Sequence, residues 1–256
     1  MKRFLQTKRI LHAVLWILLY VYLVHLGDSI NLNNNIAYAT PILLTGLVIV
    51  LVIYMKLDHT LVDQYKTKRT GSILEYVLLF TPLVVLSLLQ FSTGINQTLQ
   101  KIQIISIVST MIAVGFIEEV LFRGFLLTSI KQKSNQKRAI IISGVTFGLG
   151  HIVNLTRGYD YVELISQIVL AITIGLALAM LFVYTKRLLP GILFHITFNI
   201  SGSLSIQSKE EQFILLVLML FIASIYCYYL YRKISLHDDM LENVGVHKQI
   251  ISGDTI

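Results

Sequence analysis

Three charged residues lie inside one long apolar segment, in the stretch GFIEEVLFRGFLL at residues 115–127. They are Glu118, Glu119 and Arg123. A charged side chain at the centre of a membrane helix costs about 2.5–3.5 kcal/mol, so the three would cost roughly 8–10 kcal/mol if they did not interact. Intramembrane ionisable groups usually face a bundle interior or a water-filled cavity. A carboxylate in such a place is a candidate general base.

The spacing of these residues divides them into a pair and a single group. Glu119 and Arg123 are four residues apart with the acid first, which is the favourable order for an ion pair on a helix. Glu118 is turned about 100° away from Glu119. We therefore expect Glu118 to be the unpaired group, facing a partner on another helix. A purely structural role for the Glu119–Arg123 pair remains open.

Two later segments, FGLGH and HITFN, place His151, His195 and Asn199 inside apolar runs. Counted from the basic ends of their helices, Glu118 and His151 lie about 20 Å deep, Asn199 about 16 Å and His195 about 10 Å. Three helices are thus predicted to bring polar side chains to one band in the cytoplasmic half of the membrane.

The helix that carries His151 also contains Gly144, Gly148 and Gly150. Small residues let a neighbouring backbone approach closely, so we expect this helix to pack tightly inside the bundle. The Gly144–Gly148 spacing is also compatible with a dimer face.

The elements that must position these residues are transmembrane helices. The chain of 256 residues is 55% hydrophobic and only 14% charged, whereas soluble domains carry about 25% charged residues. Its apolar blocks are near 20 residues long, enough to cross a ~30 Å hydrocarbon core, and a lipid-exposed backbone must satisfy its own hydrogen bonds. The sequence predicts an all-α, polytopic transmembrane bundle of about eight helices, at residues 10–27, 38–55, 73–91, 102–130, 138–154, 162–185, 188–207 and 212–231.

Lysine and arginine fall unevenly on the predicted loops. Of the 21 such residues, 17 lie in one alternating set of segments, at residues 2–9, 56–69, 131–138, 186–187 and 232–248, and three lie in the other set. Both termini are therefore predicted to be cytoplasmic. This clustering in short loops also accounts for the net charge of +7, and without a basic stripe we expect no nucleic-acid partner.

The segments EEVLFR, FGLGH and HITFN resemble the three motifs of the CAAX protease and bacteriocin-processing family, also called the Abi family. Those motifs are Glu-Glu-x-x-x-Arg, Phe-x-x-x-His and His-x-x-x-Asn, and the family's superfamily includes type II CAAX prenyl endopeptidases. The order and spacing fit, and the resemblance covers residues 118–199, about a third of the chain. Each motif alone is weak, but the three in order on membrane helices are specific.

The resemblance implies an intramembrane endopeptidase that uses an activated water and no cofactor. Glu118 and His151 would activate the water, and His195 and Asn199 would stabilise the oxyanion. The second glutamate and its arginine would hold the site in shape. The implied substrate is a membrane-associated peptide or protein, such as a prenyl-tail-like, pheromone or bacteriocin precursor. A multi-pass protein of a bacterial plasma membrane is expected, while the oligomeric state cannot be predicted.

Other functions remain open beside this one. Glu118, His151 and His195 could ligate zinc in a metallopeptidase, although the sequence has no His-Glu-x-x-His. A member of the same family could be a non-catalytic immunity or scaffold protein. A proton-coupled carrier is less favoured, since inverted repeats are not evident.

The resemblance also suggests how the chain is divided. We expect a transmembrane peptidase domain at residues 1–232, with its motif core at 115–200. A loosely ordered cytoplasmic tail is predicted at residues 233–256.

Overall fold

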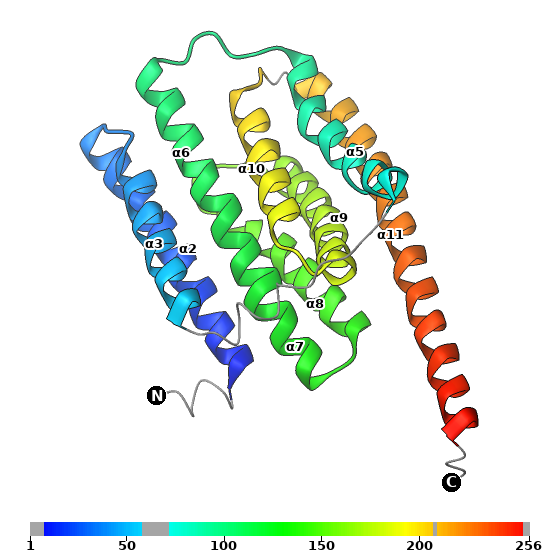
Figure 1. Cartoon of the computed structure of the whole chain (residues 1–256). Coiled ribbons are helices and arrows are strands. Elements are labelled where there is room, and N and C mark those ends of the chain that lie inside the picture. Colours follow the sequence, from blue (N-terminus) through cyan, green and yellow to red (C-terminus); the bar gives the residue numbers. More distant parts are fainter. Residues whose placement is uncertain (1–7, 58–71, 207–208, 253–256) are drawn as a thin grey trace.

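The computed structural model of the protein describes residues 8–57, 72–206 and 209–252, and these residues are helical without any strand (Figure 1). The only pairing of extended backbone in this part is an isolated antiparallel bridge between Ile95 and Ser205. The predicted all-α bundle is therefore confirmed. Its helices are α2 (Arg9–Asn34), α3 (Ala39–Leu57), α5 (Ile73–Leu89), η1 (Gln90–Thr93), α6 (Lys101–Glu118), η2 (Glu119–Leu127), α7 (Thr128–Lys133), α8 (Gln136–Leu149), η3 (Gly150–Arg157), α9 (Tyr161–Thr185), α10 (Leu189–Leu204) and α11 (Lys209–Ser252).

Seven helical segments of the described chain are long and apolar enough to cross a membrane, so the protein is a multi-pass membrane protein. The eighth predicted segment, residues 188–207, forms α10. It has 16 residues and is about 24 Å long, which is shorter than a ~30 Å hydrocarbon core. It packs against α6 and α5 and therefore lies within the bundle. Two of the candidate residues, His195 and Asn199, lie on this helix.

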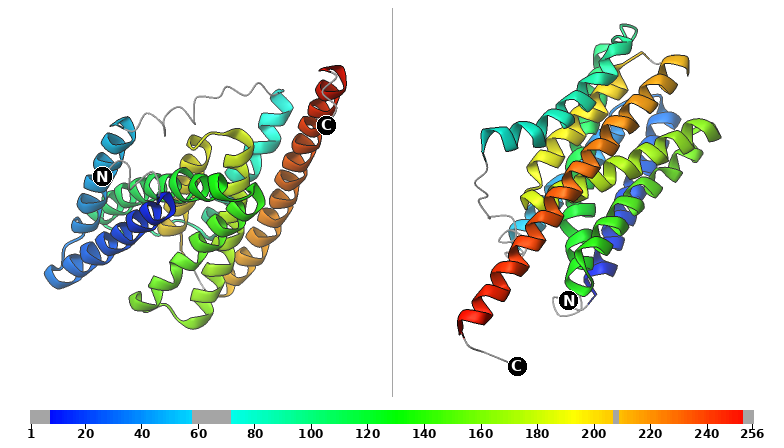
Figure 2. Two further views of the ribbon diagram at one scale, coloured as in Figure 1. Left: turned by 90° about the horizontal axis from the view of Figure 1, so that it is seen from below. Right: turned by 90° about the vertical axis from the view of Figure 1, so that its right-hand side faces the viewer.

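The helices form two groups on either side of a central pair, α6 and α10 (Figures 1 and 2). On one side α2 packs on α3, and on the other α8 packs on α9, which in turn packs on α11. The long helix that begins with α6 lies between the groups and contacts α3 and α10. The start of α2, the turn between α7 and α8, and the far end of α11 lie at one end of the bundle (Figure 1).

This arrangement agrees with an even number of crossings. Which end faces the cytoplasm stays a prediction. The basic residues at 2–3 and 66–69 that contribute to it lie outside the described residues.

The fourth predicted segment is one continuous helix whose geometry changes along its length. It is α-helical to Glu118, π-helical from Glu119 to Leu127, and α-helical again through α7. All nine residues of the π-helical segment are buried. Segments of π-helix are rare and are frequently found at functional sites. The change begins between the two adjacent glutamates, so it sets their directions relative to each other.

The glycines of α8 form the contact with α9. A Cβ atom at Gly148 would lie 2.6 Å from the backbone nitrogen of Ile172, and one at Gly144 would lie 2.8 Å from that of Leu176. The predicted tight packing within the bundle is confirmed. The dimer-face alternative is wrong for this pair, because α9 of the same chain already occupies that face. Gly150 is different, since a Cβ atom there would meet no atom within 4 Å.

The last helix continues beyond the predicted span. We expected loosely ordered chain after Lys233, but α11 runs from Lys209 to Ser252 and extends past its neighbours (Figure 2). Its 44 residues correspond to about 66 Å, more than twice the thickness of the hydrocarbon core. The sequence from Lys233 to Val244 contains neither glycine nor proline, so no residue of this stretch breaks the helix. The assignment of residues 233–256 to a cytoplasmic tail stays a prediction.

Candidate active site

The six predicted site residues come from three parts of the fold. Glu118 ends α6, and the neighbouring π-helical segment η2 carries the second glutamate and the arginine. His151 lies in η3, and α10 carries His195 and Asn199. Contacts join the two glutamates, the arginine and His195 into one network, whereas His151 and Asn199 line a cavity together with Glu118.

The predicted ion pair is present and fully buried. Arg123 Nη1 lies 2.9 Å from Glu119 Oε1, and the two side chains are 0% and 1% exposed. Arg123 Nη2 also donates a hydrogen bond to the carbonyl oxygen of Gly175 on α9, at 3.1 Å. The guanidinium lies over the ring of Phe147, 4.5 Å from its centroid. The arginine therefore connects three helical segments around the site.

His195 lies between the two glutamates. Its Nε2 is 3.1 Å from Glu118 Oε2, and its Nδ1 is 3.4 Å from Glu119 Oε1. The side chain is 5% exposed and packs edge-on against the ring of Phe147. Both ring nitrogens thus face carboxylates, and His195 is not among the residues that line the cavity. Glu118 therefore faces a partner on another helix, as expected, and the same histidine also joins it to the buried ion pair, which the spacing did not indicate.

Tyr20 on α2 is a contact of the site that the sequence did not single out. Its hydroxyl donates a 2.7 Å hydrogen bond to Glu118 Oε1, and the residue is 8% exposed. The one signal in the sequence that could have identified it is its residue type, because a buried tyrosine hydroxyl usually needs a hydrogen-bond partner. However, the same helix contains Tyr22, which is 61% exposed, and no pattern distinguishes the two. The two oxygens of Glu118 therefore contact groups from two different helices.

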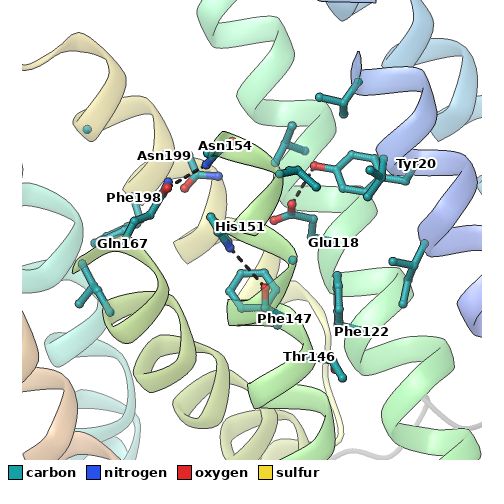
Figure 3. Close-up of a pocket in the computed structure, with 18 of the residues that line it drawn as sticks. Tyr20, Glu118, Phe122, Thr146, Phe147, His151, Asn154, Gln167, Phe198 and Asn199 are labelled. Atoms are coloured by element: carbon teal, nitrogen blue, oxygen red, sulfur yellow. Dashed lines mark hydrogen bonds between the residues drawn. The ribbon is translucent and has the colours of Figure 1, made fainter. Parts of the chain in front are cut away.

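The remaining candidates face a cavity of about 1770 Å³ inside the bundle (Figure 3). Glu118, His151 and Asn199 line it from α6, η3 and α10, and Tyr20 and Phe122 lie beside them. His151 is half-buried, and its Nδ1 lies 3.3 Å from the carbonyl oxygen of the residue four positions earlier. Its ring packs edge-on against the aromatic ring at position 147. A carboxylate, an imidazole and an amide thus meet in one space large enough for a peptide segment.

The donor set does not favour a metal. Within residues 8–57, 72–206 and 209–252, no three His, Cys, Asp or Glu side chains are grouped so that they could hold a metal ion. The zinc alternative therefore lacks a ligand set in the described chain. Cys227, on α11, contacts the carbonyl oxygen of Thr173 on α9 and is not among the residues that line the cavity.

The fold and the site together define a multi-pass helical membrane protein with a buried carboxylate network beside a large cavity. Residues 100–201 match the family model described as Type II CAAX prenyl endopeptidase Rce1-like. The match covers about two fifths of the chain, contains all six candidate residues and confirms the resemblance found in the three motifs. Because this family is one of endopeptidases, the match points to protease activity. No curated protein and no solved structure matches the chain.

Proposed function

We propose that the protein is a glutamate-dependent intramembrane endopeptidase that hydrolyses a peptide bond with an activated water. The observation that carries the proposal is the position of Glu118: it lies inside the family-matched segment and lines the cavity with His151 and Asn199. The substrate is a membrane-associated peptide or protein. A bacterial plasma membrane with cytoplasmic termini is the proposed setting, on the basis of the basic loops.

In this mechanism Glu118 accepts a proton from a water that attacks the scissile carbonyl carbon. The proton then passes to the leaving amine, so one carboxylate acts first as base and then as acid. His151, on the opposite wall, helps to orient the water. The side-chain amide of Asn199 donates to the oxyanion, an interaction that counts for more in a low-dielectric site than in water. No thiol or serine nucleophile takes part.

His195 fits a different role from the one that the resemblance implies. An oxyanion donor must point at the space where the substrate carbonyl lies. Both nitrogens of His195 instead face the carboxylates of Glu118 and Glu119, and the residue does not line the cavity. We therefore assign it to positioning: it fixes the direction of Glu118 and ties it to the buried ion pair.

The substitution Glu118→Gln tests the proposal, because it keeps the shape of the side chain and removes the base. The purified protein is assayed on a fluorogenic farnesylated peptide, and the membrane peptides of producing cells are compared by mass spectrometry. A loss of base catalysis corresponds to a fall of roughly 10²- to 10⁴-fold. The matched control is Glu211→Gln, at an exposed position near the start of α11.

Wild-type cleavage by the Glu118→Gln protein would refute the proposal. A cellular phenotype that survives both Glu118→Gln and His151→Ala would favour the non-catalytic immunity or scaffold function instead.

A further inference from the structure

His151 lies in η3, a 3₁₀-helical segment of eight residues that continues α8 from Gly150 to Arg157. Segments of this kind are rarely longer than three or four residues, because their hydrogen bonds are poorly aligned. The ring of His151 packs on Phe147, and its Nδ1 faces the carbonyl oxygen of that residue, so both contacts fix it relative to α8. The position of His151 in the cavity therefore depends on what holds η3 in place.

Asn154 holds η3 against α9. It lies three residues after His151, and residues three apart lie on the same face of a 3₁₀-helix. The side chain is 5% exposed, and its Nδ2 donates a 2.8 Å hydrogen bond to Oε1 of Gln167 (Figure 3). Its Oδ1 accepts a 3.0 Å hydrogen bond from Nη1 of Arg157. Asn154 thus uses both ends of its amide, one towards α9 and the other towards the end of η3.

Arg157 extends these contacts to α2. Its Nη2 forms an ion pair with Oδ2 of Asp28, and both side chains line the cavity. The other oxygen of Asp28 accepts a 2.8 Å hydrogen bond from the hydroxyl of Thr40 on α3. The two helices approach closely at this point, because a Cβ atom at Gly27 would lie 2.6 Å from the Cα atom of Thr40. The carboxylate of Asp28 is therefore itself held in place.

The ion pair joins two walls of the cavity that have different packing partners. The helix α2 packs against α3, η2 and α7, whereas η3 packs against α8 and α9. Tyr20, which donates to Glu118, lies eight residues before Asp28 on α2, about 12 Å along the helix. On the facing wall His151 lies six residues before Arg157, and Figure 3 shows it across the cavity from Tyr20 and Glu118. One contact thus links the helix that orients Glu118 to the segment that carries His151.

We propose that Asn154 and Arg157 are positioning residues of the site. Together with Asp28 they hold η3 at a fixed distance from α2 and so fix the separation of His151 from Glu118. This inference rests on the proposed function, in which those two side chains act on the same water. An exposed ion pair contributes little to stability, and this one is about a third exposed, so its main effect is geometric. A displacement of about 1 Å at a reacting group lowers a rate by about 100-fold.

The separation of the two walls is measured first, without using activity. In the full chain with Cys227→Ala, spin labels are attached at Leu32→Cys on α2 and Leu155→Cys on η3, which are both exposed positions. Their distance distribution is recorded by pulsed electron spin resonance. Arg157→Gln is expected to broaden the distribution, whereas the control Arg187→Gln, at an exposed position after α9, should leave it unchanged. A distribution as narrow in Arg157→Gln as in the parent overturns the inference.

Cleavage kinetics are the second measurement. On the farnesylated peptide, Arg157→Gln is expected to lower kcat roughly 10- to 100-fold with little change in KM. Asp28→Asn should have the same effect, and the double variant should lose no more than either single variant, because both changes remove one contact. A change confined to KM, or losses that multiply in the double variant, overturns the inference.

Thermal unfolding separates positioning from stability. Each variant should lower the unfolding temperature by less than about 4 °C, because the ion pair is exposed. A larger fall, together with a loss of kcat, would assign these residues to stability and overturn the positioning role.

Failure of this inference and failure of the proposed function give different results. If Glu118→Gln abolishes cleavage and Arg157→Gln does not lower kcat, the positioning role is overturned and the proposed function stands. If Glu118→Gln cleaves like the wild type, the proposed function fails. The spin-label distances then still decide whether the ion pair sets the separation of α2 and η3.

Discussion

Substitution of Arg123 by methionine should be among the most destabilising single changes at the site. Methionine keeps much of the side-chain volume and removes the charge. The change leaves Glu119, which is 1% exposed, without its ion-pair partner. It also removes the hydrogen bond to the carbonyl of Gly175 and the contact with the ring of Phe147. The loss is therefore electrostatic, with little change in packing.

The magnitude follows from the burial of the pair. Removing one member of a buried ion pair costs about 3–5 kcal/mol, mostly because the other charge remains buried and uncompensated. For a chain of this size, each kcal/mol lowers the unfolding temperature by about 2–4 °C. Arg123→Met should thus lower it by roughly 6–20 °C. The double variant Glu119→Gln with Arg123→Met removes both charges and should recover a large part of that loss.

The assay is thermal unfolding of the purified protein in a mild detergent, followed by fluorescence of the single tryptophan, Trp16. Arg138→Met is the matched control, because Arg138 is exposed at the start of α8. Surface substitutions of this kind usually stay within about 0.5 kcal/mol. The reasoning fails if Arg123→Met shifts the unfolding temperature no more than Arg138→Met does. It also fails if the double variant is no more stable than the single one.

Three further predictions address packing, positioning and metal dependence. Gly148→Ala should destabilise the protein by about 1–3 kcal/mol, because its Cβ would lie 2.3 Å from an Ile172 side-chain carbon. The control Gly46→Ala should not destabilise it, because a Cβ there would meet no atom within 4 Å. The same thermal unfolding assay distinguishes the two variants. Tyr20→Phe should lower kcat roughly 10- to 150-fold with little change in KM, since a hydrogen bond to a charged group contributes about 1.5–3 kcal/mol. Tyr22→Phe should match wild type, and a change confined to KM would contradict this role. Exhaustive chelation should leave peptide cleavage unchanged, and activity lost and then restored by zinc would contradict the metal-free mechanism.

The helical bundle and a short list of candidate residues could be predicted because of what hydrocarbon excludes. Charged groups inside apolar spans are expensive and therefore rare, so only a few residues were candidates. The Glu119–Arg123 contact was predictable for a local reason, because residues four apart on a helix are neighbours whatever surrounds them. The glycines of α8 identified a tightly packed face in the same way.

The partners of Glu118 could not be predicted, because they depend on how helices far apart in the sequence are rotated against one another. Hydrophobic spans of this kind carry little amphipathic signal, so the sequence does not indicate which side of α2 turns Tyr20 inwards. The π-helical segment adds a second difficulty. It alters the angle between side chains from Glu119 onwards, and an apolar run gives no warning of it. The two glutamates do face different partners, as predicted, but the residues that contact Glu118 could not be identified from helix geometry alone.

The contacts of His195 change how the cost of the three charges is offset. The spacing suggested an ion pair and a separate base that faces another helix, and His195 joins the two by contacting both carboxylates. Residues within one such network do not act independently, and their substitutions are expected to be non-additive. A change at Glu119, which does not line the cavity, would therefore alter the direction of the candidate base through His195. The buried ion pair thus connects the stability of the bundle to the geometry of the base. A substitution in this network is therefore expected to change both the unfolding temperature and the activity.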